Sequence, residues 1–174
     1  MTPEKNSDLP DRKTMRRKGF DYNSCGVYFL SICTKNRKNI LSDIVGTGVP
    51  DGPLPEVKLT PYGIIADKYL RQMSEFYDQL SVDLYVIMPN HIHILLRVDN
   101  GPSGTPVPTT AQNTVVARFV STFKRFCNKE YGTNVWQARS FDHIVRNNDD
   151  YIYCKNYILN NPRRWRLDEL YAEN

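Results

Sequence analysis

The chain of 174 residues contains no long hydrophobic run, and no apolar stretch approaches the roughly 20 residues that span a bilayer. Residues 1–18 are polar and lack the apolar centre of a signal peptide. The four cysteines are widely spaced and form no Cys-x-x-Cys pair, so neither a zinc site nor a disulfide framework is indicated. Histidines number only three, and there is no internal repeat. These absences predict a cytoplasmic protein with no membrane partner.

The formal net charge is only +4, but the basic residues are unevenly distributed. They gather in three clusters: Arg12, Lys13, Arg16, Arg17 and Lys18; Lys35, Arg37 and Lys38; and Arg163, Arg164 and Arg166. Basic clusters interleaved with aromatic residues suit a phosphate backbone and unstacked bases. The alternative is a solvated surface with basic tails. We expect nucleic acid as the partner.

Strand and helix patterns alternate along most of the chain. We expect residues 1–20 to form a basic N-terminal arm and residues 21–174 to form a single domain. Runs of β-branched and aromatic residues predict strands over 26–34, 57–59, 81–88, 91–98 and 141–145. Apolar residues at helical spacing predict helices over 61–77, 115–126 and 148–161. Glycine and proline mark 45–56 and 100–112 as loops.

This order of elements predicts an α+β fold. Strand, helix, strand, strand, helix, strand is the order of the ferredoxin-like βαββαβ plait, with an antiparallel sheet, and here a further helix is added at the C-terminus. The first and third core strands lie at the centre of such a sheet. Two helices would cover one face, and the other face stays open unless the C-terminal helix folds across it.

Two of the histidines lie in the expected strand 91–98. Side chains on a strand alternate between faces, so His91 and His93 point the same way, with Cα atoms roughly 6.5–7 Å apart. The alternate residues are core candidates and comprise Ile92, Ile94, Leu96 and Val98. The pair is therefore a candidate two-imidazole metal site. The alternative is a pair of structural histidines.

The C-terminal helix offers the groups that such a site lacks. Tyr157 and Asn161 are one turn apart on one stripe, with Tyr153 at its edge as a rival tyrosine. Two neutral imidazoles and an amide oxygen suit Mn²⁺ or Mg²⁺. A tyrosine beside such an ion can attack a phosphodiester, which forms a phosphotyrosine and frees a 3′ hydroxyl. We therefore expect strand cleavage that can be reversed without ATP.

Two segments carry a family resemblance. The segment 88–93 (Met-Pro-Asn-His-Ile-His), followed by 157–162 (Tyr-Ile-Leu-Asn-Asn-Pro), resembles the single-tyrosine HUH transposases, most of all the REP-associated tyrosine transposases. Further segments that extend the match are 28–37, 135–137, 141–146 and 161–165. The resemblance covers about residues 15–168, nearly the whole chain.

The resemblance implies specific roles. His91 and His93 would be metal ligands, Tyr157 the nucleophile, and Asn161 the helix amide that completes the site, where relatives often have glutamine. The implied substrate is single-stranded DNA, commonly beside a hairpin, and the enzyme would be a monomer or a homodimer that swaps its tyrosine helix. The competing hypothesis is a non-catalytic single-stranded nucleic-acid-binding module on the same fold.

Several further residues are candidates for contact with DNA. The set comprises Arg16, Arg17, Lys35, Arg37, Lys124, Arg125, His143, Arg163 and Arg164. The alternative for the basic side chains is a solvated surface, and His143 is equally expected to be satisfied by backbone at the end of a strand. We expect Trp136 and Trp165 to be packing anchors.

Overall fold

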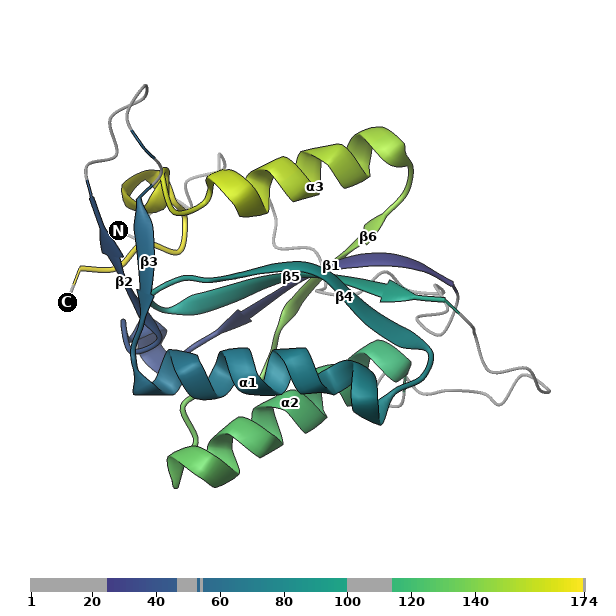
Figure 1. The fold of residues 1–174 in the computed structure, drawn as a ribbon, viewed down its shortest axis with the longest axis horizontal. Coiled ribbons are helices and arrows are strands. Elements are labelled where there is room, and N and C mark those ends of the chain that lie inside the picture. The colour runs from purple at the N-terminus through teal and green to yellow at the C-terminus, as the bar shows by residue number, and fades with distance from the viewer. Residues whose placement is uncertain (1–24, 47–52, 54, 100–113, 174) are drawn as a thin grey trace, which may run out of the picture.

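The computed structural model describes residues 25–46, 53, 55–99 and 114–173. Its centre is a four-stranded antiparallel sheet of order β4-β5-β1-β6 (Figure 1). The strands are β1 (Gly26–Cys33), β4 (Leu80–Ile87), β5 (His91–Val98) and β6 (Phe141–Val145). This is the strand order of the ferredoxin-like plait, and the predicted α+β fold class is confirmed.

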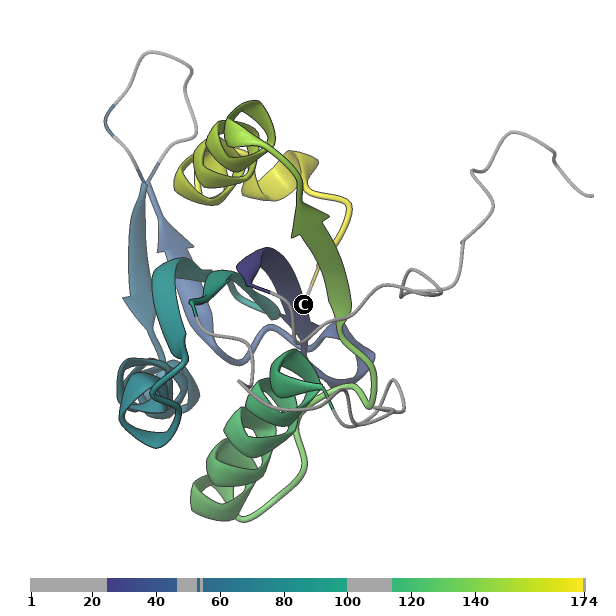
Figure 2. The ribbon, with the colours of Figure 1, turned by 90° about the vertical axis from the view of Figure 1, so that its right-hand side faces the viewer.

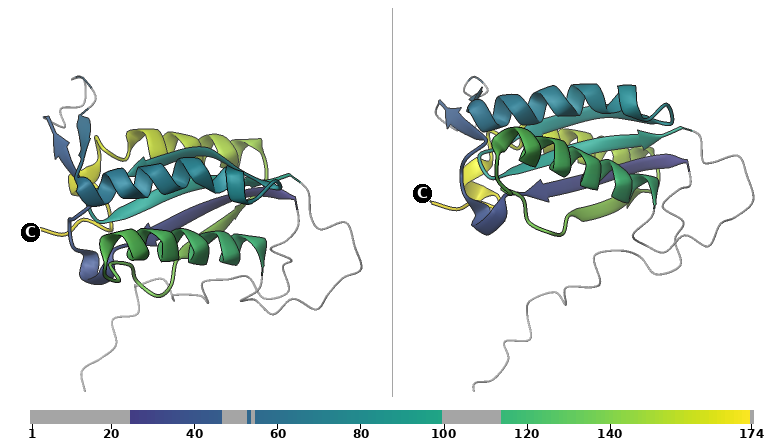
Figure 3. Two further views of the ribbon diagram at one scale, coloured as in Figure 1. Left: turned by 60° about the horizontal axis from the view of Figure 1, so that its bottom comes forward. Right: turned by 90° about the horizontal axis from the view of Figure 1, so that it is seen from below.

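The helices form a layer on each side of the sheet. Helices α1 (Pro61–Phe76) and α2 (Val115–Tyr131) lie together on one face, and α3 (Asn148–Asn160) crosses the other (Figures 1 and 2). Seen from below, α1 and α2 run side by side beneath the strands (Figure 3). The face that carries the histidines is therefore covered by the C-terminal helix. Within the described residues, no helix has the length and apolar character needed to cross a bilayer.

Polar caps explain where the helices begin. The side chain of Thr60 accepts a hydrogen bond from the Gly63 amide, and Thr114 caps α2 in the same way. Helix α3 is capped by Asn147, whose side chain accepts from the Asp150 amide, one residue before the start of the predicted helix 148–161. Each cap satisfies an amide that has no partner within the helix.

A two-stranded ribbon, β2 (Ser42–Val45) paired with β3 (Glu56–Leu59), precedes α1. The strand expected over 57–59 is confirmed, whereas β2 was not predicted, and the expected loop 45–56 loses its end residues to these strands. The expected basic arm 1–20, with Arg16 and Arg17, and the whole of the expected loop 100–112 lie outside the described residues.

The sheet has an apolar core on each face. The larger core lies under α1 and α2, and it includes Ile92, Ile94, Leu96 and Val98 of β5, as expected from their alternation. A smaller cluster lies under α3 and consists of Val27, Phe29, Leu95, Cys154 and Ile158. Each fully buried aliphatic side chain stabilises the fold by about 1.5–3 kcal/mol. The smaller cluster is what attaches α3 to the sheet.

Candidate active site

The two histidines of β5 lie side by side beneath α3. Their ring centroids are 4.4 Å apart, and the exposed fractions of His91 and His93 are 0% and 2%. Between them Ile92 points into the opposite core. The alternation of a central strand thus places both imidazoles in one buried space.

The orientation of His91 is set by Asn90. The Asn90 amide nitrogen donates to the carbonyls of Leu170 (2.9 Å) and Arg37 (3.3 Å), so the Asn90 amide oxygen is left to accept. That oxygen lies 2.8 Å from Nδ1 of His91, which therefore carries the proton. The lone pair of the neutral ring is then on Nε2, the atom available to a metal.

His93 is held in a similar way by the neighbouring strand. Its Nδ1 lies 2.7 Å from the hydroxyl oxygen of Ser31, and its ring stacks on Phe29 at a centroid distance of 5.0 Å. Burial lowers the pKa of His93 well below its usual value, and the nearby His91 adds to this effect. Burial also lowers the pKa of His91 to about 4, although Asp168 and Asn161 oppose it. Both rings are therefore neutral at pH 7, the state that binds metal.

Helix α3 brings Tyr157 and Asn161 to the histidines. The Tyr157 ring meets His93 edge-on at a centroid distance of 5.3 Å and Phe29 at 5.8 Å. Asn161, the residue after the helix, is 2% exposed. The expected stripe of Tyr157 and Asn161 does face the histidine pair.

The two other tyrosines of α3 are directed elsewhere. Tyr153 is 70% exposed to solvent. Tyr151 packs against the smaller core, and its hydroxyl donates to Asp83 of β4 at 3.4 Å. Tyr157 is thus the tyrosine of this helix that contacts the site.

Three buried polar atoms of the site lack a hydrogen-bond partner: Nε2 of His91, Nε2 of His93 and Oδ1 of Asn161. An unsatisfied buried polar atom costs about 1–3 kcal/mol, so three in one place call for an explanation. Each can offer a lone pair, His93 in the tautomer that donates from Nδ1 to the Ser31 hydroxyl, and a divalent cation would satisfy them together. Two neutral imidazoles and an amide oxygen fit Mn²⁺ or Mg²⁺.

Asp168 is part of the site and was not predicted from the sequence. It follows the short helix η2 (Trp165–Leu167) and accepts hydrogen bonds from Nδ2 of Asn161 (2.6 Å) and from the Tyr157 hydroxyl (3.3 Å). Potential ligand atoms of His91, His93 and Asp168 all lie within 4.8 Å of one another. The sequence feature that could have pointed to Asp168 is Trp165, because a large apolar residue in a charged segment indicates that the chain packs back onto the sheet there.

The basic candidates on the histidine side differ in their surroundings. Lys35 and Arg37 belong to the short helix η1 (Lys35–Arg37), where Lys35 is exposed and Arg37 donates to the Glu169 carbonyl at 3.1 Å. Arg37 has φ 53, a left-handed conformation that costs on the order of 1 kcal/mol or more outside glycine. Arg163 and Arg164 follow α3, the first half-buried and the second exposed.

The remaining candidates are engaged elsewhere or lie on the far face. Arg125 and Lys124 belong to α2, and Lys124 is buried with its ammonium 2.7 Å from the Gln137 carbonyl and 3.4 Å from the carbonyls of Ala138 and Arg139. This placement gives Lys124 a structural role in place of the predicted phosphate contact. His143 pairs with the Asp150 carboxylate at 2.9 Å, which joins β6 to α3, so it bonds a side chain and not the backbone.

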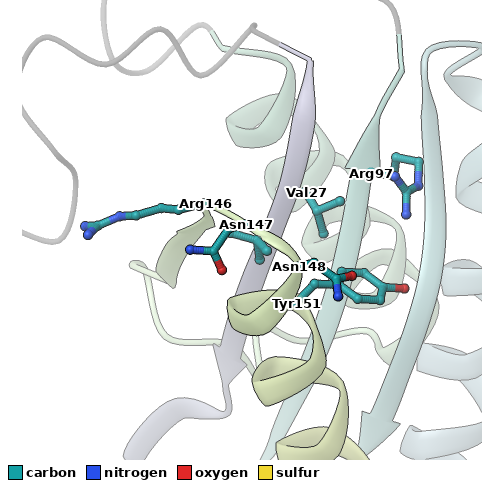
Figure 4. Close-up of a pocket in the computed structure, with 7 residues that line it drawn as sticks. Val27, Arg97, Arg146, Asn147, Asn148 and Tyr151 are labelled. Carbon is teal, nitrogen blue, oxygen red and sulfur yellow. The ribbon is translucent and has the colours of Figure 1, made fainter.

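A shallow hollow of about 430 Å³ lies beside the start of α3 (Figure 4). Its lining combines apolar, aromatic and cationic groups and comprises Val27, Arg97, Val145, Arg146, Asn147, Asn148 and Tyr151. Arg97 forms an ion pair with Asp83, whereas Arg146 extends away from the helix. The hollow lies on the α3 face of the sheet, at the end of the helix opposite Asn161.

No protein-family model matches the chain. The chain is 27% identical over 188 aligned residues to an uncharacterised protein of Haemophilus influenzae, a match that covers 99% of this chain and 100% of that protein. The structure is similar to that of a REP-associated tyrosine transposase bound to a REP hairpin, with a TM-score of 0.58 and 18% identity, covering 86% of this chain and 72% of the other. A candidate transposase of Deinococcus radiodurans R1 gives a TM-score of 0.42 and 20% identity, covering 83% and 97%. The chain thus has the fold of a REP-associated tyrosine transposase, as the sequence resemblance implied.

Proposed function

We propose that this chain is a tyrosine transposase of the HUH type, which cleaves and rejoins single-stranded DNA. Tyr157 is the nucleophile, and His91, His93 and Asn161 are the ligands of a divalent ion, Mg²⁺ or Mn²⁺. The observation that carries the proposal is the set of three buried, unpartnered lone pairs beside the Tyr157 ring. The shared fold with a transposase supports it.

The chemistry follows from these groups. The Tyr157 oxygen attacks a backbone phosphorus, a bond forms between that oxygen and phosphorus, and the bond to the 3′ oxygen breaks. The 3′ oxygen leaves with a proton as a free hydroxyl, and the 5′ phosphate stays on the tyrosine. His91, His93 and Asn161 would hold the cation, which would supply Lewis-acid polarisation of a phosphoryl oxygen. Attack by another 3′ hydroxyl reverses the step and joins two strands.

The hydroxyl of Tyr157 starts this reaction in its protonated form. Burial, and after it the neighbouring Asp168 carboxylate, together raise the pKa of Tyr157 to about 12. The phenol must therefore lose its proton as the new bond forms. At neutral pH the resting enzyme holds the hydroxyl as a donor to Asp168, beside the metal ligands.

The surroundings suit a DNA strand. Lys35, Arg37 and Arg164 supply positive charge on the histidine side, and the hollow beside Tyr151 has the size for one unstacked base. We propose hairpin-flanked single-stranded DNA as the substrate, because the similar transposase is bound to a REP hairpin. Within the proposed single domain over 21–174, the Tyr157 ring contacts His93 of the same chain, and we propose that each chain holds a complete site and acts as a monomer.

One observation favours the alternative of a non-catalytic binding module. The two histidines and Asn161 are at most 2% exposed, so a phosphate oxygen cannot reach them without a local movement. Such a module would bind single strands through the same basic groups, with or without a metal.

Covalent trapping tests the proposal. A labelled DNA hairpin with single-stranded flanks is incubated with Mn²⁺ or Mg²⁺, and the protein–DNA adduct is measured on a denaturing gel. We expect Tyr157→Phe to abolish the adduct and to leave hairpin affinity unchanged, because the ring contacts with Phe29 and His93 do not use the hydroxyl.

Tyr153→Phe is the matched control, since Tyr153 lies on the same helix and faces solvent; it should form the adduct at the wild-type level. An adduct that persists in Tyr157→Phe contradicts the assigned nucleophile. A wild-type protein that binds the hairpin equally well with and without chelator, and forms no adduct, is a binding module.

A further inference from the structure

We infer that Asp168 is a positioning residue of this site. Its carboxylate fixes the Asn161 amide so that the amide oxygen faces the histidines, and it holds the Tyr157 hydroxyl next to them. The inference rests on the proposed function, because it assigns Asp168 a task toward the same metal ligands and nucleophile.

The two ends of the Asn161 amide have different surroundings. Oxygen and nitrogen have nearly the same size, so their hydrogen-bond partners decide which way the group points. Nδ2 of Asn161 donates to Oδ2 of Asp168 at 2.6 Å, a charge-assisted bond. Oδ1 is thereby directed to the other side, where it is buried and unpartnered. Without the carboxylate, nothing in these contacts would keep the amide nitrogen from turning toward a cation.

Asp168 is itself within reach of the histidines, so it could be taken for a metal ligand. Its hydrogen bonds argue for the positioning role. Oδ2 accepts from Asn161 and Tyr157, and Oδ1 accepts from the Leu170 amide at 2.7 Å. Both oxygens are satisfied, whereas the two histidine nitrogens and the Asn161 oxygen are not. The unsatisfied atoms are the ligands, and the satisfied carboxylate orients one of them.

Residues before and after Asp168 hold its segment against the site. Trp165 is 9% exposed, and its ring centroid lies 5.9 Å from that of His91. After Asp168, the Leu170 carbonyl accepts from Asn90, the residue that orients His91. Residues 168–170 therefore orient a ligand from the helix and a ligand from the strand at once. The Asp168 side chain orients Asn161, and the Leu170 carbonyl orients His91 through Asn90.

Metal binding tests this inference without reference to activity. Mn²⁺ is titrated into the full chain, and free Mn²⁺ is measured by its electron paramagnetic resonance signal. We expect Asp168→Ala to weaken Mn²⁺ affinity by about 10–100-fold, the usual effect of removing an outer partner of a ligand. Glu169→Ala is the control, since it removes the same charge from an exposed neighbour, and it should bind as the wild type does.

A double variant separates positioning from direct ligation. If Asp168 acts through Asn161, then Asp168→Ala should cost no further affinity once Asn161→Ala is present. Additive losses would mean that Asp168 binds the ion itself, and they would overturn the inference. Should Asp168→Ala fail to fold, Asp168→Asn takes its place. It keeps an oxygen to accept from Asn161, so affinity within about tenfold of wild type is expected, and a loss equal to that of His91→Ala would contradict the role.

The two proposals fail in different ways. If the wild-type chain binds no Mn²⁺, the proposed metal site is wrong, and so is the proposed function. A wild-type chain that binds Mn²⁺, with Asp168→Ala binding equally well, overturns the positioning role alone. More adduct from Asp168→Ala at unchanged Mn²⁺ affinity would do the same, since the carboxylate would then restrain the tyrosine.

Discussion

At the scale of single residues, the protonation of His91 and His93 governs the response of the fold to acid and, under the proposed function, the binding of the metal. Burial is the main cause of their lowered pKa values, and the folded chain holds both rings neutral. In the unfolded chain a histidine is protonated below its ordinary pKa of 6.5. The unfolded state therefore binds more protons as pH falls, and unfolding becomes more favourable.

This gives a prediction for the metal-free protein. Its free energy of unfolding should fall as pH drops from 6.5 toward about 4, the window set by the pKa of His91. Each such histidine adds a slope of up to ~1.4 kcal/mol per pH unit. Urea unfolding at several pH values measures the slope. His91→Gln should be less sensitive to acid than the wild type, and parallel curves for the two proteins would contradict the prediction.

The site residues that follow a regular period could be predicted from the sequence. His91 and His93 are two apart on a strand, and Tyr157 and Asn161 are four apart on a helix, so elementary geometry puts each pair on one face. Asp168 lies beyond the helix, on a segment whose path depends on the packing of Trp165. No local period predicts such a position. The pairing of Nδ1 of His93 with Ser31 likewise depends on which strand becomes the neighbour of β5.

At the scale of elements, the strands of the central sheet were predicted to within about a residue, because alternation and β-branched runs are strong over eight residues. The ribbon strand β2 was missed, since it has only four residues and a single buried one. Whether α3 covers the histidines could not be read from the sequence, because only Cys154 and Ile158 of that helix are buried.

Lys124 shows why a basic residue on a helix is a weak sign of DNA binding. Burial lowers its pKa to about 8, so the ammonium is still charged at neutral pH and donates to the chain that leads into β6. We expect Lys124→Met to lower the free energy of unfolding by about 1–3 kcal/mol, because the carbonyls of Gln137, Ala138 and Arg139 lose a charged donor. Chemical denaturation measures this.

The affinity for a DNA hairpin should distinguish Lys124 from an exposed arginine. Lys124→Met should leave it unchanged, whereas Arg164→Ala, at an exposed position after α3, should weaken it with little effect on stability. If Lys124→Met has normal stability but reduced affinity for the hairpin, then Lys124 contacts DNA.

At the scale of the whole molecule, the site is assembled within one chain. The Tyr157 ring lies 5.3 Å from the ring of its own His93, and α3 packs on the sheet of the same chain through the smaller core. The plait itself was predicted, because the order of strands and helices limits the topology to few choices. The position of α3 on the sheet could not be predicted in this way, because it depends on how the side chains of the smaller core pack.

Mixing two inactive variants tests this assembly. Tyr157→Phe keeps the ligands, and His91→Ala keeps the nucleophile. We expect no covalent adduct from the mixture, because neither chain holds a complete site. An adduct from the mixture alone would show that two chains exchange the tyrosine helix and that the active form is a homodimer. Wild type diluted with either variant serves as the activity control.

The packing of Tyr157 has a consequence for how such a chain evolves. Its ring fills space against Phe29 and His93, while the proposed chemistry depends on the hydroxyl. A single base change converts a tyrosine codon into one for phenylalanine. Under the proposed function, a lineage can therefore lose strand cleavage in one step and still inherit a folded protein with its DNA-binding surface, so enzyme and binding protein are neighbours in sequence space.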